Sequence, residues 1–176
     1  MANALMTDED YVALPDDGNR SEVIEGELCV LPAPNLKHQR VLFKLALQLG
    51  NFVEARDSVD VVLSKTNVVQ PDLLYVSNGR LNILTEAGVS GAPDLAVEVL
   101  SASTHRRDEV TKLRLYEDFG VDEYWIVDTT HLSIRVYRRS TAKLEFVMEV
   151  LEEQNDELTT PLLPGLTVSL AEIFED

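Results

Sequence analysis

Two carboxylates stand where the sequence otherwise predicts buried strands. Glu98 interrupts the apolar run at residues 95–100, and Asp72 comes directly before a second apolar run at residues 73–76. A buried, uncompensated carboxylate is costly, so each acid needs a partner. Neighbouring strands lie about 4.8 Å apart, so both side chains can reach one ion if they face the same side of a sheet.

Carboxylate and carbonyl oxygens are the ligands that Mg²⁺ prefers, and Mn²⁺ accepts the same donors. Asp72 and Glu98 therefore predict a metal site, to which the backbone carbonyl of Val99 would add a third ligand. The alternative is structural: backbone donors or basic side chains satisfy the two acids separately.

Lys112 is the basic residue best placed to join these acids. At about 100° per residue, Lys112 falls on the inward arc of its predicted helix, beside Tyr116 and Phe119. The exposed face carries Thr111, Arg114 and Asp118. One interpretation is an ammonium that orients a water molecule and offsets charge on a phosphate. The others are a lysine whose stem packs on aromatic rings, and an ion pair with Glu98 that is purely structural.

Other polar residues are weaker candidates. Glu22 could reach the site from a hairpin or could be an exposed strand glutamate, and His38 could contact a substrate or cap its helix. Asp94 shares a face with Glu98 but lies four residues, or roughly 13 Å, along the strand, so we interpret it as an edge or capping residue. Cys29 is the only cysteine, which excludes an intrachain disulfide and a thiolate zinc cluster.

The net charge of −16 is unfavourable for binding to a nucleic acid. The excess lies at the ends, because residues 1–27 contribute −7 and residues 145–176 contribute −9, whereas residues 28–144 are neutral. The chain, 45% hydrophobic, fits a single domain over residues 1–176. No signal-like or membrane-spanning segment is visible in the sequence, so we expect a cytoplasmic protein that does not bind a membrane.

The order of elements predicts a mixed α/β fold around a central sheet. It opens with a short helix after Thr7 and a hairpin that turns at Gly26. Apolar residues at helical spacing then predict a long helix over residues 37–56 and a second helix over residues 106–119, which ends at Gly120. Strands are expected at residues 59–63, 72–76, 94–100, 123–127, 132–137 and, as the final strand, 144–151. Residues 77–93 are expected to form an irregular surface excursion, and residues 170–174 a closing turn.

Several of these residues fall together into a known pattern. Residues 22–28, Pro34, His38, residues 71–72, residues 93–101, Lys112 with Tyr116, and residues 120–128 resemble the Uma-two family of restriction endonucleases. The resemblance extends over residues 7–174. It implies the PD-(D/E)XK nuclease fold, a central mixed sheet flanked by helices, and Mg²⁺-dependent hydrolysis of DNA.

The resemblance also implies roles for individual residues. Asp72 matches the motif aspartate, Glu98 the acid of (D/E)XK, and Glu22 the acid from the first part of the fold. The motif lysine is replaced by Leu100, and the resemblance points to Lys112 on the next helix instead. By analogy with nucleases of this fold we expect a homodimer on DNA, and the alternative is a catalytically silent nuclease-fold protein that binds or regulates a partner.

Overall fold

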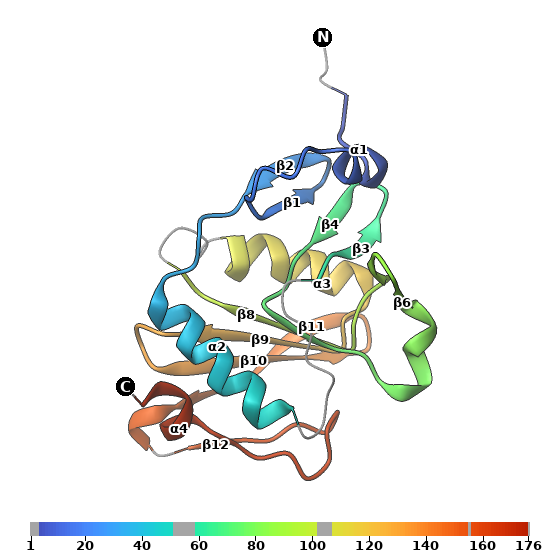
Figure 1. The fold of residues 1–176 in the computed structure, drawn as a ribbon. Coiled ribbons are helices and arrows are strands. Elements are labelled where there is room, and N and C mark those ends of the chain that lie inside the picture. Colours follow the sequence, from blue (N-terminus) through green and yellow to red (C-terminus); the bar gives the residue numbers. More distant parts are fainter. Residues whose placement is uncertain (1–3, 51–58, 102–106, 155, 176) are drawn as a thin grey trace.

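The computed structural model describes residues 4–50, 59–101, 107–154 and 156–175. Its first half contains α1 (Asp8–Val12), β1 (Ser21–Ile24), β2 (Glu27–Val30), α2 (Leu36–Leu49), β3 (Val61–Ser64), β4 (Asn67–Val69), β5 (Leu73–Tyr75), the 3₁₀-helix η1 (Asn78–Ile83), β6 (Leu84–Thr85) and β7 (Gly88–Ser90). The second half contains β8 (Leu95–Val99), the π-helix η2 (Arg107–Lys112), α3 (Leu113–Phe119), β9 (Glu123–Asp128), β10 (Ser133–Ser140), β11 (Lys143–Leu151), the 3₁₀-helix η3 (Glu152–Gln154), β12 (Glu157–Leu158), β13 (Val168–Ser169) and α4 (Leu170–Phe174). Figure 1 shows their arrangement.

The N-terminal helix and hairpin form as the sequence predicts. The Thr7 hydroxyl accepts a hydrogen bond from the Asp10 amide, and the Asp10 carboxylate accepts one from the Thr7 amide, which is a complete capping box. Strands β1 and β2 pair antiparallel across Glu25 and Gly26, whose φ angles are 53° and 78°. Two positive φ angles define the tight turn whose twist matches that of paired strands.

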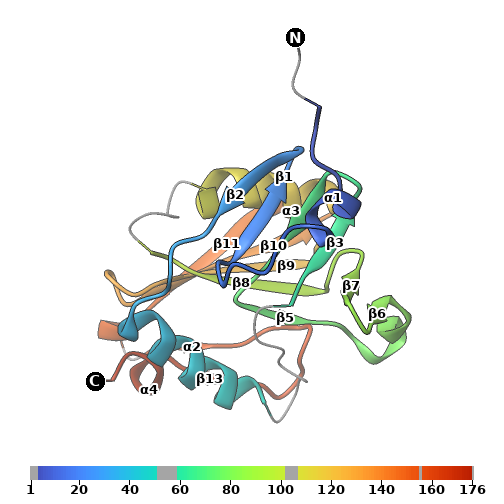
Figure 2. The same cartoon turned by 45° about the horizontal axis from the view of Figure 1, so that its top comes forward.

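This hairpin belongs to a six-stranded sheet with the order β2-β1-β4-β3-β7-β6. Figure 2 shows the sheet running from β2 at the top to β6 at the lower right. The prediction of an irregular excursion at residues 77–93 is wrong, because these residues form η1, β6 and β7, and β7 pairs parallel with β3. Strands of two or three residues are too short to show an alternating pattern in the sequence.

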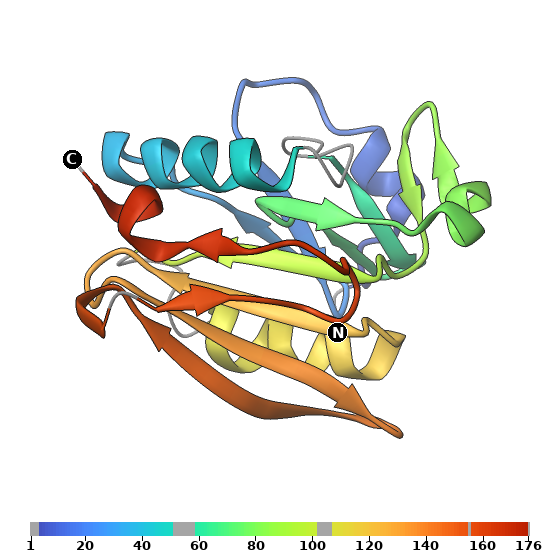
Figure 3. The same ribbon diagram turned by 90° about the horizontal axis from the view of Figure 1, so that it is seen from below.

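The central sheet has five strands in the order β11-β10-β9-β8-β5. Strands β8 and β9 pair parallel through the crossover that contains α3, and the other neighbours pair antiparallel. Helices α2 and α3 lie on opposite faces, as Figure 3 shows from below. Residues of β8 alternate between the two cores, so that Val97 packs with α2 and Ala96 packs with α3.

The long helix α2 buries the predicted stripe of Val41, Leu42, Leu45 and Leu49. Its predicted continuation to residue 56 lies outside the described residues, as does the start of the second helix at residue 106. That second helix is π-helical before it becomes α-helical, and it ends at Gly120 with a left-handed φ of 87°. Glycine adopts this conformation without the cost of a Cβ.

Residues 144–151 form a strand, β11, as predicted, but the prediction that this strand is the final one is wrong. Strands β12 and β13 follow as a separate two-stranded sheet, and residues 170–174 form helix α4 rather than a turn. The mixed α/β fold class is confirmed. Among the described helices, none is long and apolar enough to cross a membrane.

Candidate active site

Asp72 comes directly before strand β5, and Glu98 lies on the neighbouring strand β8. The antiparallel register of β5 and β8 pairs Leu73 with Val97 and Leu74 with Ala96. The Val99 amide, next to Glu98, donates a hydrogen bond to Oδ2 of Asp72 at 2.8 Å, which brings Asp72 to the end of β8. Both residues are buried: only 5% of the surface of Asp72 and 4% of that of Glu98 is exposed. Both residues line the same cavity, described below.

The Glu98 carboxylate is compensated by two donors. Its Oε1 lies 2.7 Å from Lys112 Nζ and 2.8 Å from the Tyr116 hydroxyl. Burial raises the pKa of Glu98 well above its usual value, and Lys112 only partly opposes this effect. The negative charge of Asp108 raises it further. The ionised form of Glu98 is therefore disfavoured in its buried position, and an additional positive charge nearby would stabilise it.

Lys112 is held by acids from three elements. Its Nζ lies 2.7 Å from Oε1 of Glu22 and of Glu98, and 3.9 Å from Oδ1 of Asp108. Burial alone would lower the pKa of Lys112, but the nearby carboxylates raise it instead. The predicted inward direction of this side chain is confirmed, since only 3% of it is exposed. Lys112 stays charged and offsets much of the cost of burying its partners.

Glu22 is the acid that β1 contributes, and it is fully buried. Its Oε1 accepts a hydrogen bond from the Gln70 amide at 2.8 Å. Its Oε2 has no hydrogen-bond partner among the described residues, although Arg107 Nη1 lies 3.9 Å away. The alternative of an exposed strand glutamate is therefore wrong, because β1 turns this position toward α3 rather than toward solvent.

Asp72 is surrounded by donors. Its Oδ2 accepts a hydrogen bond from the Val99 amide at 2.8 Å and lies 3.2 Å from His38 Nε2, while its Oδ1 lies 3.5 Å from Arg20 Nη1. Burial would raise the pKa of Asp72, but the hydrogen bond and charge of His38 outweigh it and the pKa is lowered. His38 therefore reaches the site from the first turn of α2, as the sequence allowed.

These side chains line a cavity of about 190 Å³. Arg20, His38 and Gln70 form part of its wall, together with the proline-rich segment at residues 31–35. Asp72, Glu98, Val99, Asp108 and Lys112 line it as well. We call this cavity the site pocket. Asp94 does not line this cavity; it accepts hydrogen bonds from the Ser77 amide and from Arg80 instead.

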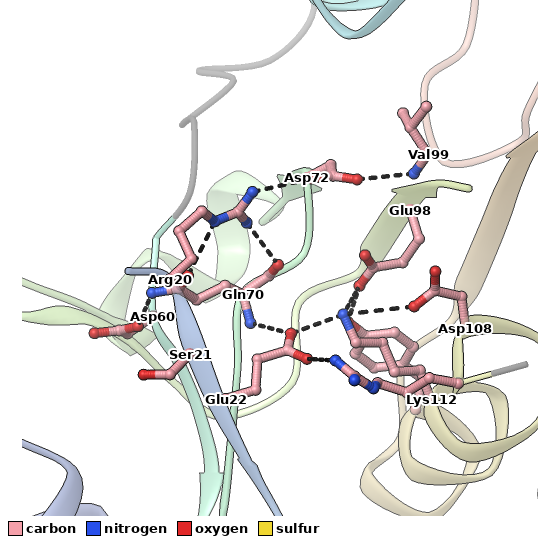
Figure 4. A network of polar contacts seen from close by, with 12 residues as sticks. Arg20, Ser21, Glu22, Asp60, Gln70, Asp72, Glu98, Val99, Asp108 and Lys112 are labelled. Carbon is pink, nitrogen blue, oxygen red and sulfur yellow. Dashed lines mark hydrogen bonds and ion pairs between the residues drawn. The ribbon is translucent and has the colours of Figure 1, made fainter. Parts of the chain in front are cut away.

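The sequence did not indicate three residues of the site: Arg20, Gln70 and Asp108. Figure 4 shows Arg20 and Gln70 beside Asp72, and Asp108 beside Lys112. Asp108 could have been found, because it lies one helical turn before Lys112 and hence on the same face. Arg20 meets Gln70 across 50 residues of sequence, and no local pattern reports such a contact.

The donor set of the site pocket fits Mg²⁺. This ion keeps several waters and binds proteins through one or two carboxylates, which Asp72 and Glu98 provide. Among the described residues, no group of three His, Cys, Asp or Glu side chains is arranged to hold a metal. A site built on the protein alone, such as a zinc centre, is therefore not formed by these residues.

Two buried acids and a buried lysine thus meet beside a mixed sheet. The chain belongs to the Uma2 family, whose model is described as "Putative restriction endonuclease" and matches residues 8–171. The family membership that the sequence indicates is thereby confirmed.

A solved structure shares this fold. The crystal structure of a "putative nuclease belonging to DUF820" from Anabaena variabilis ATCC 29413 matches with a TM-score of 0.77 and 20% sequence identity. The match covers 96% of this chain and 97% of the other. No curated protein matches the chain.

Proposed function

We propose that the protein is a Mg²⁺-dependent endonuclease that hydrolyses phosphodiester bonds of DNA. The observation that carries this proposal is the presence of Asp72 and Glu98 in one pocket, with Lys112 2.7 Å from Glu98. Membership of a family of restriction endonucleases supports the same reaction class.

Asp72 and Glu98 would hold the ion, with the Val99 carbonyl as an additional ligand. Bound Mg²⁺, or Mn²⁺ in its place, supplies Lewis acidity and charge for hydrolysis of a phosphodiester. Val99 and His38 keep the Asp72 carboxylate oriented. Lys112 contributes positive charge next to the reacting phosphate and positions a water, and Glu22 fixes the ammonium from the opposite side.

Cleavage of supercoiled plasmid DNA tests this proposal. The wild-type protein is expected to nick and linearise the plasmid with Mg²⁺ and not with a chelator. Glu98→Ala and Asp72→Asn are expected to reduce cleavage to background while the circular dichroism spectrum stays unchanged. Glu145→Gln, an exposed acid on β11, is the matched control and should cleave like the wild type. Cleavage that survives Glu98→Ala would remove the proposal.

A second candidate is a catalytically silent nuclease-fold protein that binds a partner. The observation that favours it is the engagement of Lys112 by both Glu22 and Glu98, which stabilises the site without any metal. Titration with Mn²⁺ separates the two candidates. The nuclease is expected to bind Mn²⁺ and to lose binding in Asp72→Asn, whereas the silent protein shows neither effect.

We further propose that the protein acts in the cytoplasm as a homodimer, one subunit for each DNA strand. The support for self-association is an apolar edge on β11, where Phe146, Val147 and Met148 are 56%, 42% and 36% exposed. An exposed edge strand of this kind is a template for pairing with another chain. Light scattering is expected to give twice the chain mass, and Phe146→Lys to give the monomer.

A further inference from the structure

Arg20 is a cation of the site pocket for which the sequence analysis assigned no role. It follows the loop before β1 and lines the pocket beside Asp72. Its side chain is 27% exposed, compared with 3% for Lys112. A ligand that enters the pocket can therefore contact Arg20 without unpacking the core.

The guanidinium group of Arg20 is held in place by one residue. Nε donates to Gln70 Oε1 at 3.2 Å, and Nη2 donates to the Gln70 carbonyl at 3.2 Å. Gln70 is fixed in turn, because its Nε2 donates to Asp60 at 2.7 Å and its amide donates to Glu22 at 2.8 Å. Figure 4 shows this chain of contacts. Arg20 is thus oriented before any ligand binds, which reduces the entropy lost on binding.

Arg20 also has donors to spare. A guanidinium carries five N–H groups, and the contacts with Gln70 and Asp72 engage three. The contact with Asp72 is 3.5 Å long, at the outer limit of a hydrogen bond. Arg20 therefore borders the pocket without forming a close ion pair with its neighbouring acid.

The other basic residues of the pocket wall are more firmly engaged. Lys112 lies 2.7 Å from two carboxylates, and His38 contacts Asp72 at 3.2 Å. The acids that face the pocket would repel a phosphate, so an anion needs a cation with unused donors. Arg20 meets that requirement, and its planar fork matches phosphate oxygens better than an ammonium does.

We propose that Arg20 binds a non-bridging oxygen of the nucleic-acid phosphate in the site pocket, and that Gln70 is its positioning residue. This inference rests on the proposed function for its substrate, but binding of phosphate can be measured without cleavage. Arg20 would then act on the reacting phosphate directly, by offsetting the charge that develops there.

Binding of inorganic phosphate in the presence of Mg²⁺, followed by ³¹P NMR, tests the inference. Wild-type protein is expected to bind phosphate, and Arg20→Met to bind it about tenfold more weakly or worse. Arg114→Met, an exposed arginine on α3, is the matched control and should bind like the wild type. Gln70→Leu should weaken binding in the same direction, since it removes the side-chain anchor of the fork.

The outcomes for Arg20 and for nuclease activity are separable. If Arg20→Met binds phosphate as the wild type does, or if the wild type binds none, the inference is overturned. If Arg20→Met loses phosphate binding while wild-type protein cuts no DNA, the anion site stands and the proposed reaction fails. Where the wild type cleaves, Arg20→Met is expected to lower kcat/KM by about 100-fold, and Arg20→Lys to recover part of that loss because it keeps the charge.

Discussion

The ammonium nitrogen of Lys112 lies 2.7 Å from Oε1 of Glu98, and both side chains are almost fully buried. The pair joins strand β8 of the central sheet to the end of the π-helix η2, 14 residues later in the chain. Because a second carboxylate, Glu22, contacts the same ammonium from β1, Lys112 also ties the central sheet to the six-stranded sheet. The stability of the protein and its proposed chemistry therefore depend on the same residue.

Lys112→Met is expected to lower the free energy of unfolding by about 3–5 kcal/mol, because it leaves Glu22 and Glu98 without their shared counter-charge. Urea denaturation measures this loss. Glu22→Gln in the same background should restore part of it, since Glu22 is then no longer an uncompensated buried carboxylate. A double variant no more stable than Lys112→Met alone would contradict this account of the ion pair.

Glu98→Gln is expected to change how stability depends on pH. Burial raises the pKa of Glu98 above its ordinary value of 4.5, so the folded protein holds a proton that the unfolded chain releases. The resulting stabilisation is complete below pH 4.5 and is lost as pH rises through the folded pKa, at up to about 1.4 kcal/mol per pH unit. The wild type should therefore lose stability relative to Glu98→Gln as pH rises from 4.5. If urea denaturation shows that the free energy of unfolding changes with pH in the same way for both proteins, burial does not raise the pKa of Glu98.

Asp72→Asn is expected to change how the stability of the protein depends on pH in acid, between pH 2 and 5. The pKa of Asp72 is lowered below 3.8, despite burial, by His38 and the Val99 amide. Stability from this carboxylate is present above pH 3.8 and is lost as pH falls through the folded pKa. Denaturation between pH 2 and 5 should show a steeper acid loss in the wild type than in Asp72→Asn. An equally steep loss in both proteins would assign the acid sensitivity to other groups.

Gly26→Ala tests the hairpin that carries Glu22. A Cβ at Gly26 would lie 2.6 Å from Leu5 Cβ, and the φ of 78° disfavours any other residue. The expected loss is about 1–3 kcal/mol in thermal or urea unfolding. Gly79→Ala is the matched control, because nothing lies within 4 Å of a Cβ there. Equal stabilities of the two variants would mean that the hairpin turn tolerates rearrangement.

The sequence was sufficient for elements with a repeated pattern. The stripe of α2, the run around Glu98 and the turn at Gly26 each follow from local spacing or local conformation. The inward face of Lys112 could be predicted for the same reason, since helical phase is a local property.

Other features depend on contacts between distant segments. Strand β4 has three residues, and its place between β1 and β3 is decided by pairing rather than by its own pattern. The burial of Glu22 depends on Lys112 and Gln70, which lie in other elements. In the sequence, Arg20 is an isolated base in an acidic segment, and only the folded chain brings it beside Gln70.

A crystal soaked with Mn²⁺ tests the central claim most directly. The account predicts an anomalous difference peak between the carboxylates of Asp72 and Glu98, and its loss in Asp72→Asn. Absence of that peak in the wild type, with Lys112 still in contact with Glu98, would contradict a metal-dependent nuclease and leave a structural ion pair in its place.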